Sequence, residues 1–204
     1  MSAQVLSVSL PSEIIYVSGT VNGTAYTWTL IEGAWTATVE RAANDTYAVA
    51  LTAVTAAGVS TNYTLTLYYG LLSLITDRTR ADVENETDKG FYNASDLNRV
   101  GAAVEYIADR FTALGYACPV TVKKDWLTSD APTASQMETY RQNIVTLRGQ
   151  IAVMASTPDA PASMAGLNYV KANNIEQILL DLDALLTNAA AAWYQSGELF
   201  AGEV

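Results

Sequence analysis

The stretch Tyr63-Thr-Leu-Thr-Leu-Tyr-Tyr-Gly-Leu-Leu-Ser-Leu-Ile-Thr-Asp-Arg-Thr79 contains the change of pattern that decides the fold. Up to Tyr69, apolar and polar residues alternate, which is the period of a half-buried strand. After Gly70 the apolar residues recur at steps of three and four, as on one face of a helix. The sequence therefore predicts an α+β protein with segregated halves, an all-β domain over residues 1–72 and an all-α domain over residues 73–204.

The β half contains several short alternating runs. Their shared faces carry Tyr26, Trp28 and Leu30; Tyr47, Val49 and Leu51; and Tyr63, Leu65, Leu67 and Tyr69. Residues that tolerate turns separate the runs at Asn22-Gly23, Glu32-Gly33, Asn44-Asp45 and Ala57-Gly58. The first of these pairs suits a type I′ hairpin, because both of its residues accept positive φ. Roughly six short strands with such turns predict a sandwich or a small barrel.

One of these runs also carries a family resemblance. The residues from Asp45 to Gly58 contain a Tyr-x-Val-x-Leu-Thr-Ala strand that leads into a Gly turn. This pattern resembles the late strands of bacterial and phage immunoglobulin-like repeats. The resemblance implies an Ig-like sandwich without the disulfide of antibody domains, because Cys118 is the single cysteine.

The α half is divided into helices by capping residues. Thr79 and Ser95 are placed as N-caps, Thr133 and Gln136 form a capping box, and Gly115 is placed to end a helix. Three long apolar stripes with one face each predict a three-helix bundle, because they can be buried only against one another. The predicted helices span residues 79–86, 96–114, 134–153 and 169–194.

Composition limits the classes of function. The chain has 204 residues, half of them hydrophobic, and a net charge of −10. A negative surface repels nucleic-acid phosphates and anionic lipid, so neither is an expected partner. No apolar run reaches the roughly 18 residues of a membrane span, and the first ten residues alternate like a strand rather than a signal peptide.

The acidic residues give no clear metal or catalytic site. The run Asp82–Gly90 alternates oxygen-bearing residues, but in an EF-hand register from Asp82 the sixth residue is Thr87 and the twelfth is Asn93. A helix start and a turn therefore explain this run better than calcium binding. Asp181 and Asp183 point roughly 200° apart on a helix, so they are interpreted as solvent-facing. Asp109 and Arg110 are likewise interpreted as solvent-facing, with a role in surface solubility or in an i,i+4 pair between Glu105 and the neighbours of Asp109.

Nucleophilic catalysis also lacks its usual residues. The chain has no histidine, so Cys118 has no imidazole to activate it and is interpreted as a buried structural thiol. A hydrolase would need an acid pair, which the sequence does not show; joint substitution of Asp96, Glu105 and Asp109 would test this hypothesis. The sequence thus predicts a protein that is not an enzyme, with no catalytic, cofactor-binding or metal-binding residue and no cofactor. We interpret the five Asn-x-Ser/Thr sequons as accidents of composition; they begin at Asn22, Asn44, Asn62, Asn85 and Asn93.

Aromatic residues of the β half suggest a second function. An exposed aromatic face would suit a free carbohydrate- or cell-surface-binding module, formed by Tyr16, Trp28, Trp35, Tyr68 and Tyr69. However, Trp28 and Trp35 fall in register with strand cores, which predicts that they are buried.

Several motifs of the α half resemble a family of phage and prophage structural proteins of the tail and baseplate region. They are residues 74–83, 92–100, Glu105-Tyr106, Asp125-Trp126, 175–183 and 196–203. The stretch between Val83 and Gly90 is shorter than the family's usual charged insertion, which leaves the first short helix in doubt. The resemblance assigns no binding residue.

The resemblance implies a virion structural protein that acts in assembly or in contact with the host surface. Its expected partners are other tail or baseplate proteins, with a host-surface glycan or protein as a further candidate. Because tails have rotational symmetry, a homo-oligomer is expected. The expected location is the virion, after synthesis in the bacterial cytoplasm and release by lysis; either half could be the one that anchors the protein.

Overall fold

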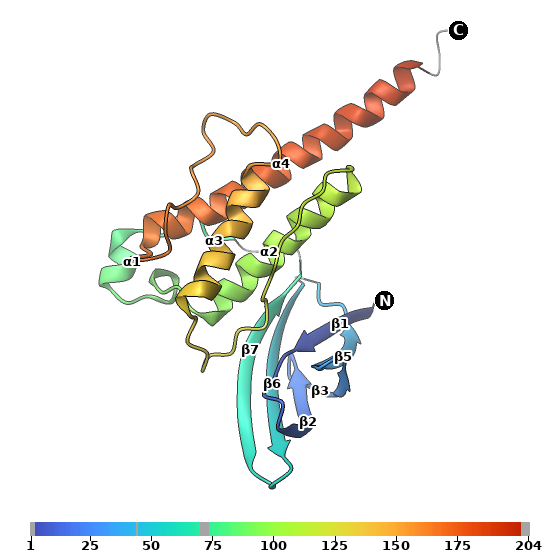
Figure 1. The fold of residues 1–204 in the computed structure, drawn as a ribbon, viewed down its shortest axis with the longest axis vertical. Helices are drawn as coiled ribbons and strands as arrows, with labels where there is room; N and C mark the ends of the chain where they lie inside the picture. Colours follow the sequence, from blue (N-terminus) through green and yellow to red (C-terminus); the bar gives the residue numbers. More distant parts are fainter. Residues whose placement is uncertain (1–2, 44, 70–73, 201–204) are drawn as a thin grey trace. The chain divides into compact units, whose positions relative to one another are not determined.

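A computed structural model describes residues 3–43, 45–69 and 74–200, with side chains up to residue 192 in the last helix. Antiparallel sheets come first along the chain and helices follow, as the sequence predicts (Figure 1). The strands are β1 (Ala3–Val8), β2 (Ile14–Val21), β3 (Thr24–Thr27), β4 (Thr29–Ile31), β5 (Ala34–Glu40), β6 (Thr46–Thr55) and β7 (Ser60–Tyr68). The helices are α1 (Arg80–Glu84), the 3-10 helix η1 (Asp88–Gly90), α2 (Ala94–Ala113), α3 (Ala134–Arg148) and α4 (Tyr169–Phe200).

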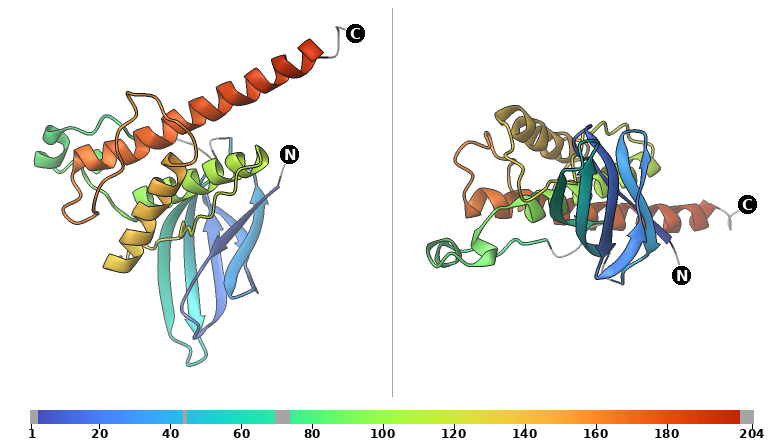
Figure 2. Two further views of the ribbon diagram at one scale, coloured as in Figure 1. Left: turned by 45° about the horizontal axis from the view of Figure 1, so that its top comes forward. Right: turned by 90° about the horizontal axis from the view of Figure 1, so that it is seen from below.

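The strands form two antiparallel sheets, which Figure 2 shows as two layers. One sheet has the order β1-β5-β4 and the other has the order β3-β2-β6-β7. Alternate residues of each long strand enter the core between the sheets, so the predicted period of two is confirmed. On β6 and β7 the inward residues include Tyr47, Val49, Leu51, Leu65 and Leu67.

One of the three predicted inward faces is not a single face in the structure. Trp28 is buried, but Leu30 is 53% exposed, although the two residues are in the same alternating run. The chain leaves one sheet after Thr27 and joins the other at Thr29, so the residues on either side of Trp28 belong to different sheets. Alternation along the sequence cannot reveal this change of sheet, because it depends on which strands pair.

The predicted hairpin at Asn22-Gly23 is confirmed. Val21 pairs with Thr24, which leaves a loop of two residues, and both loop residues have positive φ. The Asn22 side chain also accepts from the Ala48 N–H and donates to the Thr46 carbonyl of β6, which fixes the turn against the sheet. Asn44, in another predicted turn, lies outside the described residues.

The helix caps confirm two predictions and correct a third. Thr79 forms a capping box with Asp82, and Thr133 forms one with Gln136. The cap of α2 is Asn93 and not Ser95, because the Asn93 side chain accepts from the N–H groups at the start of the helix.

Three predicted helix ends are also corrected. α1 ends at Glu84, before Glu86 turns to positive φ, and α3 ends at Arg148, with Gly149 as its C-cap. α4 extends to Phe200, since the run of alanines after residue 188 favours helix.

The chain divides into two compact units whose members are not consecutive in sequence. The first contains residues 1–72, 92–102 and 123–132, and the second contains residues 73–91, 103–122 and 133–204. The predicted boundary between residues 72 and 73 lies outside the described residues and stays a prediction. Two segments of the α half therefore belong to the compact unit that contains the sheets.

The core of the first unit includes a side chain from its third segment. Leu127 is 6% exposed and belongs to the same apolar cluster as Leu6 and Val8 of β1. We call residues 123–132 the strap. Because Leu127 is one of the buried residues of this cluster, the strap is a component of the core of the first unit and not a linker.

The second unit has a helical core made by one stripe from each long helix. α2 contributes Val104, Ile107, Ala108 and Phe111, α3 contributes Tyr140, Ile144 and Leu147, and α4 contributes Ala172, Ile175, Ile178, Leu179, Leu182 and Leu186.

We expect Gly90→Ala to lower the free energy of unfolding of the second unit by about 1–3 kcal/mol. A Cβ at this position would lie 2.2 Å from the Asp82 carbonyl oxygen and 2.8 Å from the Val83 backbone nitrogen. Both contacts are with backbone, which cannot move aside as a side chain does. Urea unfolding followed by circular dichroism measures the loss; an unchanged midpoint would contradict the close approach.

Candidate functional site

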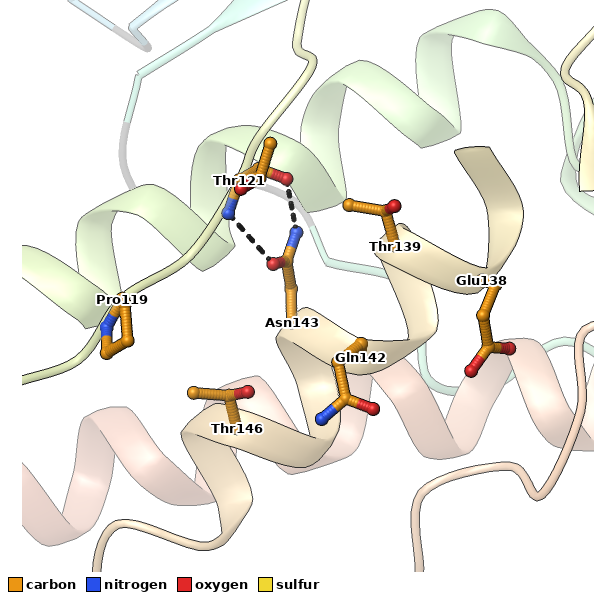
Figure 3. Close-up of a pocket in the computed structure, with 7 residues that line it drawn as sticks. All are labelled: Pro119, Thr121, Glu138, Thr139, Gln142, Asn143 and Thr146. Atoms are coloured by element: carbon orange, nitrogen blue, oxygen red, sulfur yellow. Dashed lines mark hydrogen bonds between the residues drawn. The ribbon is translucent and has the colours of Figure 1, made fainter. Parts of the chain in front are cut away.

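The candidate site is a groove beside α3, in the second unit (Figure 3). It has a volume of about 420 Å³, within the range of small-ligand sites. One wall is segment 119–122, which forms no strand. The α3 groove is lined by Pro119, Thr121, Glu138, Thr139, Gln142, Asn143 and Thr146.

Asn143 holds the two walls of the groove together. Its side chain accepts from the Thr121 N–H at 3.0 Å and donates to the Thr121 carbonyl at 2.7 Å. Figure 3 shows Asn143 pointing from α3 to Thr121, with both bonds drawn. Because both groups of one amide are used, Asn143 can remain buried at low cost and fixes the position of segment 119–122.

The groove carries little net charge. Its carboxylate, Glu138, forms an ion pair with Arg141 one turn later on α3, with oxygen–nitrogen distances from 2.5 to 3.1 Å. Hydrogen bonding to Arg141 lowers the pKa of Glu138, so the pair stays ionised at neutral pH. The rest of the lining is hydroxyl, amide and proline, which suits an uncharged ligand that forms hydrogen bonds.

A second group of polar residues lies inside the first unit, centred on Asn98 of α2. This side chain has 0% exposure. Its amide donates to the carbonyls of Thr66 on β7 and of Trp126 in the strap, both at 3.0 Å, and its oxygen accepts from the Trp126 N–H at 2.6 Å. Asn98 therefore joins a helix, a strand and the strap.

Asp125 attaches the strap to the end of β1. Its carboxylate accepts from the Ser9 N–H at 2.6 Å and from the Lys123 ammonium at 2.7 Å. Burial alone would raise the pKa of Asp125, but the hydrogen bonds from Lys123 and Ser9 outweigh it, and the pKa lies below its ordinary value. The folded state therefore favours the ionised carboxylate.

We expect acid to weaken this attachment. The lowered pKa of Asp125 contributes stability that is present above the unfolded value of about 3.9 and is lost as pH falls through the folded value. Asp125→Asn should therefore lower the unfolding free energy by about 1–3 kcal/mol at pH 7, with the difference shrinking below about pH 4. Urea titrations across pH measure this, with exposed Asp109→Asn as the control. A difference independent of pH would contradict the assigned role.

The second unit has a buried ion pair. Arg78 and Glu176 have side chains that are 1% and 0% exposed, and their charged atoms are 2.8 Å apart. Glu176 also accepts from the Ile75 N–H at 2.6 Å, while Arg78 donates to the Ile75 carbonyl at 2.7 Å. Asn173 of α4 pairs with the backbone N–H and carbonyl of Arg78. Side chains from two successive turns of α4, Asn173 and Glu176, therefore bind segment 75–78.

Comparison of the chain with protein-family models, with curated proteins and with solved structures finds no match. Its functional interpretation therefore rests on the geometry of its own residues.

The run Asp82–Gly90 forms a helix start and a turn, as the sequence predicts. Asp82 uses its carboxylate to cap α1, and its hydrogen bonds with Thr79 lower its pKa. In the part of the chain that the structure describes, no group of three or more His, Cys, Asp and Glu residues is placed to hold a metal ion.

Two of the acidic and basic residues interpreted as solvent-facing are instead paired between helices. Arg110 of α2 forms an ion pair with Asp183 of α4 and donates to Thr187 at 3.1 Å. The surface interpretation of Arg110 and Asp183 is therefore corrected, because they connect two helices of the second unit. Asp181 accepts from Gln177 on its own helix, and Asp109 is exposed.

Of the residues considered for a hydrolase, Asp96 already has partners inside the protein. It is buried, caps α2 through the Asn93 N–H and forms an ion pair with Arg99 at 2.6 Å. Glu105 and Asp109 also belong to α2, one turn of the helix from each other. No described helix is long and apolar enough to cross a bilayer.

Cys118 is only half-buried, which corrects the prediction of a buried thiol. Burial still raises its pKa, which lowers its thiolate fraction and its reactivity. Of the five aromatics considered for a binding face, Trp28, Trp35 and Tyr68 are buried and Tyr16 is 57% exposed. The prediction that both tryptophans are core residues is confirmed.

Sequence reasoning missed the α3 groove and the roles of Asn98, Asn143 and Glu176. A signal was present for two of them, because Asn143 and Glu176 lie within apolar stripes of their helices. A polar residue at such a position needs a buried partner. Their partners, Thr121 and Arg78, are 22 and about 100 residues away, so the pattern of one helix cannot identify them.

Proposed function

We propose that this chain is a non-enzymatic structural protein of a phage virion, in the tail or baseplate region. The observation that carries the proposal is the use of its buried polar side chains. Asn98, Asp125, Asn143 and the Arg78–Glu176 pair each join segments that are distant in sequence. A scaffold needs such joints, since a unique arrangement of segments is what it contributes to an assembly.

Of the five residues that form these joints, all but Asn143 also lie in the motifs that resemble phage structural proteins. Arg78 and Glu176 lie in residues 74–83 and 175–183, and Asn98 lies in residues 92–100. Asp125 and Trp126 are themselves one of the motifs. The residues that join distant segments therefore largely coincide with the residues that carry the resemblance. This supports an architecture shared with the phage structural proteins.

The β part is proposed to be an immunoglobulin-like sandwich. In that fold one sheet holds strands A, B, E and D, and the other holds C, F and G, to which variable-type domains add C′ and C″. The orders β1-β5-β4 and β3-β2-β6-β7 match B-E-D and C′-C-F-G if β1 corresponds to strand B, with no described strand in the place of A. Tyr47, at the start of the strand that corresponds to F, accepts a hydrogen bond from the Ala42 N–H at 3.0 Å, like the tyrosine corner of that fold.

In this proposal the partners are other tail or baseplate proteins and further copies of the chain. Rotational symmetry of a tail would repeat the same contact around the axis. Contact with a host-surface glycan or protein is part of the same proposal, and location in the virion follows from it. The alternative of a free carbohydrate-binding module is weakened by the burial of Trp28, Trp35 and Tyr68.

Purified particles test the proposal directly. We expect mass spectrometry of density-purified virions to find the chain at a fixed copy number per particle. An antibody against the chain should label one end of the particle in negative-stain images. Absence of the chain from particles of a phage that expresses it, with the chain present in the lysate supernatant, would refute the proposal.

A further inference from the structure

We propose that the α3 groove binds an extended, uncharged polypeptide segment through the side-chain amide of Gln142. This inference goes beyond the structural role of the chain and does not depend on it. It rests on the shape of the groove, on its low net charge and on the way in which Asn143 already recognises main chain.

The Asn143 contact is an internal example of the proposed recognition. One amide on α3 pairs with both the N–H and the carbonyl of Thr121, in a segment that forms no strand. This pair of hydrogen bonds recognises the backbone of the bound residue and does not depend on its side chain. Gln142 carries the same chemical group on the adjacent position of α3; it is exposed, its oxygen accepts a long hydrogen bond from Arg141 at 3.5 Å, and its NH₂ group can donate to the carbonyl of a ligand.

Polar side chains on either side of Gln142 extend the proposed binding surface along α3. Thr139 lies three residues before it and Thr146 four residues after it, so the two hydroxyls flank the amide on successive turns. The Thr139 hydroxyl donates to the Ser135 carbonyl at 3.2 Å, so it can only accept from a peptide N–H of the ligand, whereas the Thr146 hydroxyl can accept from a peptide N–H or donate to a peptide carbonyl. An extended chain along α3 would therefore meet polar groups at successive turns of the helix.

Charge and lining select the class of ligand. Glu138 is already paired with Arg141, so a charged ligand gains no unpaired partner from these two residues. The lining contains no aromatic ring on which a sugar could stack. A neutral peptide, which offers alternating donors and acceptors, matches the hydroxyl and amide groups better than an ion or a sugar does.

The test is a titration of the full-length, ¹⁵N-labelled chain with N-acetyl-trialanine N-methylamide, monitored by NMR. We expect saturable shifts of the Gln142 side-chain amide and of the Thr121 and Thr146 backbone amides. Gln142→Ala should weaken binding about three- to tenfold, the size expected for one or two lost hydrogen bonds. Gln150→Ala, which removes a glutamine outside the groove lining, should leave the affinity unchanged.

Maltose, titrated in the same way, separates a peptide from a sugar. Shifts at the groove with maltose and none with the peptide would overturn the proposal in favour of a glycan site. Absence of saturable shifts with the peptide, or equal affinity in Gln142→Ala, would overturn it as well. Gln142 is exposed, so its replacement should not affect folding, and an unchanged spectrum elsewhere verifies this.

Discussion

Arg78→Met is expected to lower the free energy of unfolding of the second unit by about 3–5 kcal/mol. The substitution keeps an unbranched side chain of similar length but leaves the Glu176 carboxylate buried without its ion-pair partner. An uncompensated charge in an apolar interior costs several kcal/mol, much more than the pair itself contributes. Urea unfolding followed by circular dichroism, which reports mainly on the helices, measures the loss.

Two further variants separate this effect from a general effect of losing an arginine. Arg80, two residues later, forms an exposed ion pair with Glu84, so Arg80→Met should change the unfolding free energy by no more than about 0.5 kcal/mol. The double variant Arg78→Met/Glu176→Leu removes both charges and should recover part of the loss. Equal destabilisation by the Arg78 and Arg80 variants would contradict the importance of burial.

Asn98→Ala should destabilise the first unit by about 2–4 kcal/mol. Alanine would leave the Trp126 N–H and the carbonyls of Thr66 and Trp126 without the partner they have inside the structure. Alanine favours helix more than asparagine does, so the loss cannot come from the helix propensity of α2. Tryptophan fluorescence suits the measurement, because Trp28, Trp35 and Trp126 belong to this unit.

Asn188→Ala is the matched control for Asn98. Asn188 is exposed on α4. Its replacement by alanine changes the intrinsic helix propensity by the same amount as Asn98→Ala does. Its replacement should leave the fluorescence midpoint unchanged or slightly raised. If Asn98→Ala behaves like this control, the strap is not held to β7 by this side chain.

Local periodicity predicts the elements well because it records burial on one face. Alternation identifies the inward residues of β6, such as Tyr47 and Val49, and the capping boxes at Thr79 and Thr133 mark the starts of two helices. Leu30 is misplaced because the chain changes sheets between Thr27 and Thr29. That change depends on strand pairing, on which a single run carries no information.

Membership of the compact units is also beyond the reach of periodicity. The sequence places the strap in the α half, yet Leu127 belongs to the same buried apolar cluster as the core residues of the strands. Leu127 is one apolar residue without a repeating pattern around it, so no periodic signal marks its burial. The α3 groove likewise cannot be predicted from periodicity, because Asn143 and Thr121 come into contact only in the folded chain.

The strap and the start of α2 belong to the same compact unit as the sheets, so the three segments should unfold cooperatively. Hydrogen exchange of the full-length chain tests this most directly, by comparing the Trp126 and Leu127 amides with those of Leu6 and Val8 in β1. We predict that both groups exchange with the same free energy of opening and that Asn98→Ala lowers it equally for both. Rapid exchange of the strap amides while the β1 amides stay protected would contradict the claim.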